Sequence, residues 1–85
     1  ESMIISVDIS YYPLQAEYLA PIKDFIQRLQ THTTVRVQCN RMSTQVFGEY
    51  AEVMRVLTLE MEQSFQLPHS VFVLKFVNSD RTNSN

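Results

Sequence analysis

The stretch TTVRVQCNRMSTQVFG at residues 33–48 decides the fold, because it holds two alternating segments separated by a turn. Residues 33–40 alternate apolar with polar side chains, a period of two that is typical of a half-buried strand. The apolar side of this strand holds Val35, Val37 and Cys39. Residues 43–48 follow the turn as a second strand. The two segments therefore predict a hairpin, with Cys39 as a small core residue rather than a nucleophile.

The residues before the hairpin predict one strand and one helix. Residues 3–10 (MIISVDIS) alternate with a period of two, and Pro13 ends this strand. Pro21 suits the first turn of a helix, because a missing backbone N–H costs nothing there. The apolar face of this helix, predicted over residues 21–30, consists of Ile22, Phe25, Ile26 and Leu29.

After the hairpin, the apolar spacing lengthens to that of a second helix, which Pro68 closes. Its apolar stripe consists of Tyr50, Val53, Met54, Leu57, Met61 and Phe65. Its solvated face is expected to hold most of Glu49, Glu52, Glu60 and Glu62. Residues 70–77 (SVFVLKFV) form the fourth strand, and residues 79–85 (SDRTNSN) are expected to be a disordered polar tail.

The order of elements is β-α-β-β-α-β. With right-handed crossovers and adjacent hairpin pairing, this order predicts an α+β, ferredoxin-like sandwich. It is a four-stranded antiparallel sheet with two helices on one face. We expect one domain, residues 3–78, followed by the tail at residues 79–85.

Composition limits the classes of function. The chain has 85 residues, a mass of 9.9 kDa, a net charge of −2 and one cysteine. The acidic balance argues against nucleic acid, no apolar run is long enough for a membrane span, and a multi-cysteine zinc site is excluded. We expect a cytoplasmic protein with no catalytic residues, no cofactor and no metal. His32 and His69 are interpreted as solvated loop residues.

The outer face of the sheet, away from the helices, is predicted to mix charged and apolar side chains. Its polar members are Asp8, Arg36, Gln38 and Lys75, and its apolar members are Ile4, Phe47, Val71 and Val73. Such a face is rarely left in water, and a domain of this size buries a small core. We therefore expect a homodimer or homotetramer.

The predicted topology also gathers polar and aromatic residues at one edge of the sheet, where the first two strands end and the last two begin. These residues are Ser10, Tyr11, Tyr12, Asn40, Arg41, Ser43, Thr44, His69 and Ser70. Aromatic walls with a few convergent polar groups suit a small-molecule site. The alternative is that these residues are ordinary turn formers.

Two segments resemble motifs of the thiamine-binding, YkoF-like proteins. ISYYPL at residues 9–14 resembles their S-x-Y-P-[ML] turn, and VQCNRMSTQVFG at residues 37–48 resembles their Q-x-[DN]-x-[MV]-S-T-x-V-x-G hairpin. The likeness covers roughly residues 4–78. It implies a ferredoxin-like protein that binds thiamine or its hydroxymethylpyrimidine moiety without catalysis, as a carrier or sensor in vitamin salvage or transport.

The resemblance carries ligand-binding roles to Ser10, Tyr12, Gln38, Asn40, Ser43 and Thr44, and a backbone role to Gly48. Asp8 joins this set because a carboxylate suits a cationic thiazolium, for which Tyr11 or Tyr12 would supply an aromatic face. Arg41 is a departure from the family pattern, because a cation beside the proposed site disfavours a cationic thiazolium. With one glycine, the chain has no glycine-rich phosphate loop, which favours unphosphorylated thiamine.

Other classes of function stay open. One is a small enzyme of the dimeric ferredoxin-like barrel type, which would need a buried histidine or acid under the sheet. Another is a regulatory or scaffold module without a ligand. An RNA-recognition module is disfavoured, because the outward positions of the first strand are Ser6, Asp8 and Ser10 rather than stacking aromatics.

Overall fold

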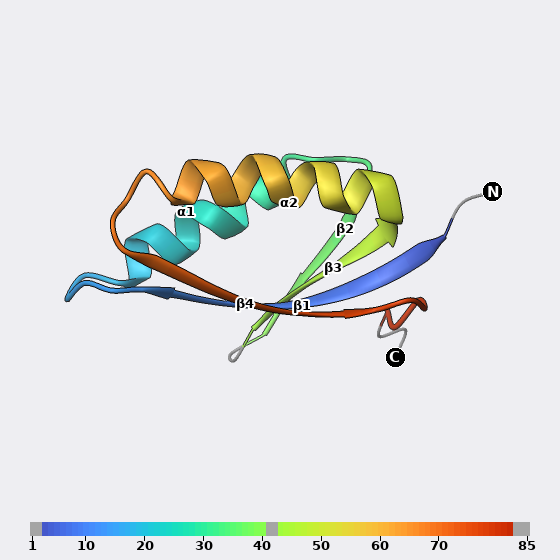
Figure 1. Cartoon of the computed structure of the whole chain (residues 1–85), viewed down its shortest axis with the longest axis horizontal. Helices are drawn as coiled ribbons and strands as arrows, with labels where there is room; N and C mark the ends of the chain where they lie inside the picture. Colours follow the sequence, from blue (N-terminus) through green and yellow to red (C-terminus); the bar gives the residue numbers. More distant parts are fainter. Residues whose placement is uncertain (1–2, 41–42, 83–85) are drawn as a thin grey trace.

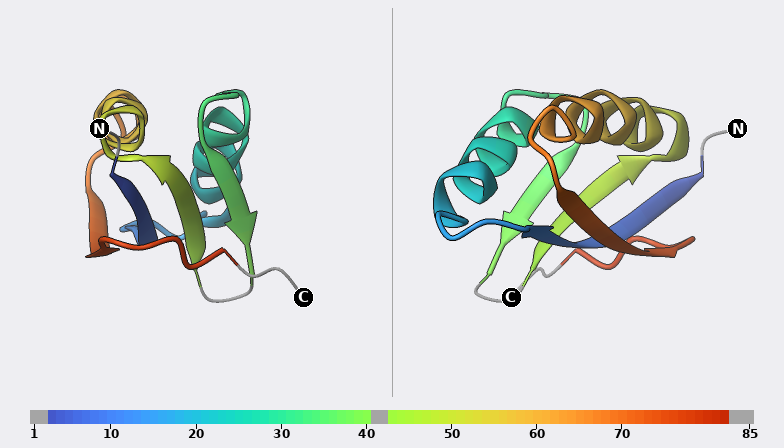
Figure 2. Two further views of the ribbon diagram at one scale, coloured as in Figure 1. Left: turned by 90° about the vertical axis from the view of Figure 1, so that its right-hand side faces the viewer. Right: turned by 60° about the vertical axis from the view of Figure 1, so that its left-hand side comes forward.

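The computed structural model of the protein describes residues 3–40 and 43–82 (Figure 1). The strands are β1 (Ile4–Pro13), β2 (Arg36–Cys39), β3 (Thr44–Glu49) and β4 (Ser70–Val77), and the helices are α1 (Leu19–Gln30) and α2 (Tyr50–Ser64). Both helices lie on one face of the sheet, as Figure 2 shows from two further directions. Neither helix in these ranges has the length and apolar character needed to cross a membrane.

The sheet has the order β2-β3-β1-β4, and every neighbouring pair is antiparallel. β1 and β2 therefore run parallel to each other and against β3 and β4. This arrangement confirms the predicted ferredoxin-like sandwich. β4 begins and ends where the sequence predicts, whereas β1 continues to Pro13 because its far end still pairs with β4.

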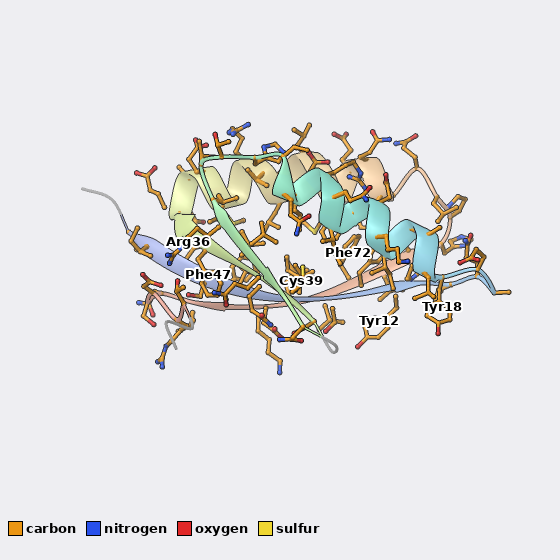
Figure 3. All side chains as sticks on the ribbon, turned by 180° about the vertical axis from the view of Figure 1, so that it is seen from behind. Tyr12, Tyr18, Arg36, Cys39, Phe47 and Phe72 are labelled. Atoms are coloured by element: carbon orange, nitrogen blue, oxygen red, sulfur yellow. The ribbon has the colours of Figure 1, made fainter. Side chains whose placement is uncertain are left out.

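The core lies between the sheet and the helices. It is built from alternate residues of the two central strands and from one stripe of each helix. Its buried members are Ile5, Val7, Ile9, Phe25, Leu29, Val35, Val46, Val53, Val56 and Leu57. The prediction that Cys39 is a core residue is wrong. Cys39 shares this face but is exposed, because it ends the edge strand β2, which the helices barely cover (Figure 3).

The buried stripe of α2 differs from the predicted one. Tyr50 and Phe65 are largely exposed, whereas Val56, Glu60 and Ser64 are buried. The difference arises because α2 packs against α1 as well as the sheet, and the contact with α1 is partly polar.

Residues 79–82, which we call the strap, were expected to be disordered and instead lie across the outer face of the sheet. The hydroxyl of Ser6 donates to the carbonyl of Ser79 at 2.7 Å and accepts from the backbone N–H of Arg81 at 2.8 Å. Arg36 contacts Asp80 at 3.7 Å and donates to Thr82. The strap thus runs from β4 over β1 and β3 towards β2 (Figure 2). The rest of the predicted tail, residues 83–85, lies outside the described residues.

Candidate functional site

Three strands bring polar side chains together on the outer face. Asp8 in β1 lies opposite Gln45 in β3 and opposite Lys75 in β4. One carboxylate oxygen of Asp8, Oδ1, accepts from the hydroxyl of Ser43 at 2.7 Å and from Nε2 of Gln45 at 2.7 Å. Asn40 donates through Nδ2 to Oε1 of Gln45 at 3.3 Å. We call Asp8, Asn40, Ser43 and Gln45 the outer cluster.

The outer cluster keeps Asp8 ionised. The hydrogen bond from Ser43 and then that from Gln45 lower the pKa of Asp8 below its ordinary value of 3.8. Burial works in the opposite direction, and the nearby charge of Lys75 lowers the pKa further. Both hydrogen bonds end on Oδ1, so Oδ2 is available as a carboxylate acceptor for a further donor.

Asn40 also holds the hairpin turn. Its side-chain Oδ1 accepts from the backbone N–H of Ser43 at 2.9 Å, and its own N–H donates to the Ser43 carbonyl at 3.1 Å. This is the local pattern by which asparagine stabilises turns. Asn40 therefore has a structural role in addition to its place in the outer cluster.

The outer cluster borders a cavity of roughly 740 Å³, which we call the outer pocket. Its walls come from all four strands and from the strap. The side chains that matter for recognition are Asp8, Gln38, Asn40, Gln45, Phe47, Lys75 and Arg81. The pocket is large enough for a small organic molecule and combines an aromatic residue with amides and charges of both signs.

The structure brings together most of the predicted site residues, but not all. Asp8, Gln38, Asn40 and Ser43 meet at the outer pocket. Ser10 and Tyr12 alternate with Asp8 on the same face of β1, but they lie beyond the hairpin, where β1 pairs only with β4. Tyr12 is 53% exposed and points away from the helices (Figure 3).

Two residues of the predicted site, Thr44 and Tyr11, lie on the helix side of the sheet. Thr44 is buried on the helix side, opposite Ile9, beside a cavity of only about 110 Å³. Tyr11 stacks on Phe72 with ring centroids 4.3 Å apart, and its hydroxyl lies 3.1 Å from that of Ser70. Tyr11 and Thr44 do not line the outer pocket, because adjacent strand positions point to opposite faces, but they share the small helix-side cavity with Asn40 and Ser43. Arg41 lies outside the described residues.

Gln45, Phe47 and Arg81 line the outer pocket but are not among the predicted site residues. For Gln45 and Phe47 a signal existed, since they alternate with Ser43 and share its face. Arg81 carried no such signal, because the docking of the strap depends on contacts with β1 and β2.

A second polar cluster lies between the helices. Glu60 accepts from Nη1 of Arg28 at 2.7 Å and is bonded to Nε2 of His32 at 2.7 Å. Arg28 also contacts Asp24 at 2.9 Å and Ser64 at 2.6 Å. The predictions of a solvated His32 and a solvated Glu60 are wrong, because these two side chains bond to each other in the contact between α1 and α2 and are largely covered there.

Burial by itself would raise the pKa of Glu60, but the hydrogen bonds from His32 and Arg28 outweigh it and lower the pKa below 4.5. Within residues 3–40 and 43–82, no three or more histidine, cysteine or acidic side chains are grouped so as to hold a metal ion. The interhelical cluster is therefore explained as a packing contact.

No protein-family model and no curated protein matches the chain. It is similar in structure to a Streptococcus pneumoniae protein, with a TM-score of 0.84 and 27% identity over 93% of this chain and 90% of that chain. It is also similar to a proposed thiamine biosynthesis/salvage protein from Thermotoga maritima, with a TM-score of 0.81 and 18% identity over 89% and 84% of the two chains.

A third similar structure is the DUF77 domain of unknown function from Bacillus cereus, with a TM-score of 0.71 and 15% identity over 99% of this chain and 84% of that one. At such identities, the likenesses to the Thermotoga and Bacillus proteins establish a shared fold. One protein with this fold carries a thiamine-related name.

Proposed function

We propose that the protein binds thiamine or its hydroxymethylpyrimidine moiety in the outer pocket, without catalysis, as a cytoplasmic carrier or sensor in vitamin salvage. The observation that carries this proposal is the outer cluster. Residues that resemble the hairpin motif of thiamine-binding proteins meet Asp8 at a cavity of roughly 740 Å³. The fold shared with a proposed thiamine biosynthesis/salvage protein adds support.

The donors and acceptors of the outer cluster suit an aminopyrimidine. The exocyclic amine of such a ring can donate to Oδ2 of Asp8, which the protein's own hydrogen bonds leave available. Gln45 can accept from the amine through Oε1, but it cannot donate to a ring nitrogen, because Nε2 already donates to Asp8 and to Ser43. Gln38 lines the same pocket. Phe47 is the aromatic residue of the pocket lining, although only 3% of it is exposed.

A binding role is favoured over an enzymatic one by the positions of the acid–base groups. His32 and Glu60 bond to each other between the helices, on the opposite side of the sheet from the outer pocket. Asp8 has a lowered pKa, which suits an ionised hydrogen-bond acceptor rather than a proton donor near neutral pH.

Titration calorimetry with thiamine, hydroxymethylpyrimidine and thiamine diphosphate tests the proposal. We expect heat with at least one of the three, and a loss of about ten- to a hundredfold in affinity for Asp8→Asn, because a charged acceptor is removed. Glu62→Gln, an equal change of charge on the exposed side of α2, is the control and should leave affinity unchanged. Absence of heat at millimolar concentration for all three ligands would refute the proposal.

We also propose that the protein is a homodimer or homotetramer. The outer side of the edge strand β4 exposes Val71, Val73 and Val77, of which Val73 is 50% exposed. An apolar strip beside unpaired backbone groups of an edge strand favours association. Phe47 does not belong to this exposed surface, because it is only 3% exposed beneath the strap.

A further inference from the structure

The strap forms one wall of the outer pocket. Its backbone is held at two points by the hydroxyl of Ser6, and Arg36 contacts Asp80. Asp80 and Arg81 each lie beside Phe47, in neighbouring hollows of the outer face. The strap therefore passes over Phe47, which explains how an aromatic residue on the outer face is almost fully buried (Figure 3).

The strap changes the charge of the outer pocket. Without the strap, the charged side chains among the described lining residues are Asp8 and Lys75, one of each sign. The strap adds Arg81, and the pocket then carries two cations and one carboxylate. Nε of Arg81 donates to the hydroxyl of Ser79 at 2.8 Å, which directs the guanidinium while leaving its terminal nitrogens for another acceptor.

The carboxylate of Asp8 already accepts two hydrogen bonds within the outer cluster, and no ion pair joins it to Arg81 among the described residues. Asp8 accepts from two neutral donors, and Lys75 acts on it through charge rather than through a hydrogen bond. Two cations beside a polar ring-binding cluster suit a ligand that carries an anionic group next to its ring.

We propose that the strap makes the outer pocket selective for a phosphate monoester of the pyrimidine ligand over the unphosphorylated form. Arg81 and Lys75 hold the phosphate, and the outer cluster holds the ring. This inference rests on the proposed function and names the class of ligand that the site prefers. It needs no glycine-rich loop, because side-chain cations replace backbone N–H groups as phosphate donors.

Calorimetry on the full chain with hydroxymethylpyrimidine and its monophosphate tests the inference. We expect the monophosphate to bind about tenfold or more tightly, because a charge-assisted contact is worth at least that factor. Arg81→Gln, and a chain that ends at Asn78, should both lose this preference while retaining affinity for the unphosphorylated ring. Arg55→Gln, which removes an exposed charge on α2, is the matched control and should keep the preference.

The docking of the strap is measured separately, by exchange of the Arg81 backbone N–H with deuterated water. Exchange should be slow in the native chain and fast in Ser6→Ala, since Ser6 is the acceptor of that N–H. Exchange at the rate of a free peptide in the native chain would overturn the inference. An equal preference for the monophosphate in the native chain and in Arg81→Gln would overturn it as well.

Inorganic pyrophosphate separates failure of this inference from failure of the proposed function. If thiamine and both pyrimidines fail to bind but pyrophosphate binds and Arg81→Gln weakens it, the proposed function fails and the anion site stands. If the unphosphorylated ring binds as tightly as the monophosphate, the proposed function stands and the selectivity inference fails. If none of the four binds, both fail.

Discussion

Asp8 in β1 bonds to Ser43 and Gln45 and lies opposite Lys75 of β4, so its protonation affects both stability and the site. Its pKa in the folded protein lies below the ordinary value of 3.8. A depressed folded-state pKa means that the stabilising contribution is fully present above the unfolded pKa and is lost as the pH falls through the folded one.

We therefore predict that Asp8→Asn destabilises the protein at pH 7 by about 1–2 kcal/mol, because hydrogen bonds to a charged acceptor contribute about 1.5–3 kcal/mol and the asparagine keeps one carbonyl acceptor. The difference between the variant and the native chain should begin to shrink as the pH falls below 3.8, because the unfolded chain takes up the proton first, and should be smallest below the folded-state pKa, where Asp8 is protonated in both states. Urea unfolding at several pH values measures this. A difference that does not change with pH would contradict the ionised role of Asp8.

Asn40 combines two roles that one substitution can separate. Asn40→Ala removes the acceptor for the backbone N–H of Ser43 and the donor to Gln45, so we expect a loss of about 1 kcal/mol of stability. If Asn40 also contacts the ligand, thiamine affinity should fall about ten- to a hundredfold. Melting temperature and affinity are measured on the same sample. A lower melting temperature with unchanged affinity would assign Asn40 to the turn alone.

At the scale of elements, the contact between α1 and α2 depends on one buried acid. Glu60→Ala should destabilise the fold by about 2–3 kcal/mol, because Arg28 and His32 lose the partner that compensates their partial burial. Glu62→Ala, two residues along the same helix and exposed, is the control and should change stability by less than about 0.5 kcal/mol. Similar effects for both variants in thermal unfolding would contradict this account.

The same contact predicts sensitivity to acid. The pKa of Glu60 lies below 4.5 in the folded protein, so its contribution is present at neutral pH and is lost as the pH falls through the folded value. The native chain should therefore lose stability below about pH 4.5, and Glu60→Gln should lose less over the same range. Parallel melting curves between pH 3 and pH 7 compare the two chains.

Gly48 is required by close packing between elements rather than by its backbone conformation. Its φ is not positive, and an added Cβ would lie 3.3 Å from Val35 Cγ1 and 3.4 Å from Val53 Cγ2. We expect Gly48→Ala to cost about 1 kcal/mol, because Val35, just before β2, and Val53 of α2 must shift slightly. An increase in melting temperature would show that the neighbouring valines adapt without strain.

At the scale of the whole molecule, the apolar strip of β4 predicts self-association. Sedimentation at about 100 μM should show a dimer or tetramer, because protein at that concentration populates even a weak interface. Val73→Asp should shift the equilibrium towards monomer, whereas Thr58→Asp on the exposed side of α2 should not. A native chain that sediments as a monomer at this concentration would refute association.

The sequence by itself determined the sandwich and the faces of its strands. The period-two pattern of residues 3–10 and of the hairpin assigns each side chain to one face, and that assignment needs only local geometry. The outward placement of Asp8, Gln38 and Lys75 followed from it directly. The same rule places Thr44 on the helix side of the sheet, on the face opposite to Asp8.

Only the tertiary structure decided which polar residues are buried and what covers the outer face. Glu60 was predicted on the solvated face of α2 and is buried only because α1 packs beside it. Its charge is tolerated because Arg28 and His32 of the other helix bond to it. The residues of the strap are all polar and show no alternation of apolar and polar side chains. It is ordered by Ser6 and Arg36, which are more than 40 residues away in the chain, so no local pattern could have revealed that Arg81 reaches the pocket.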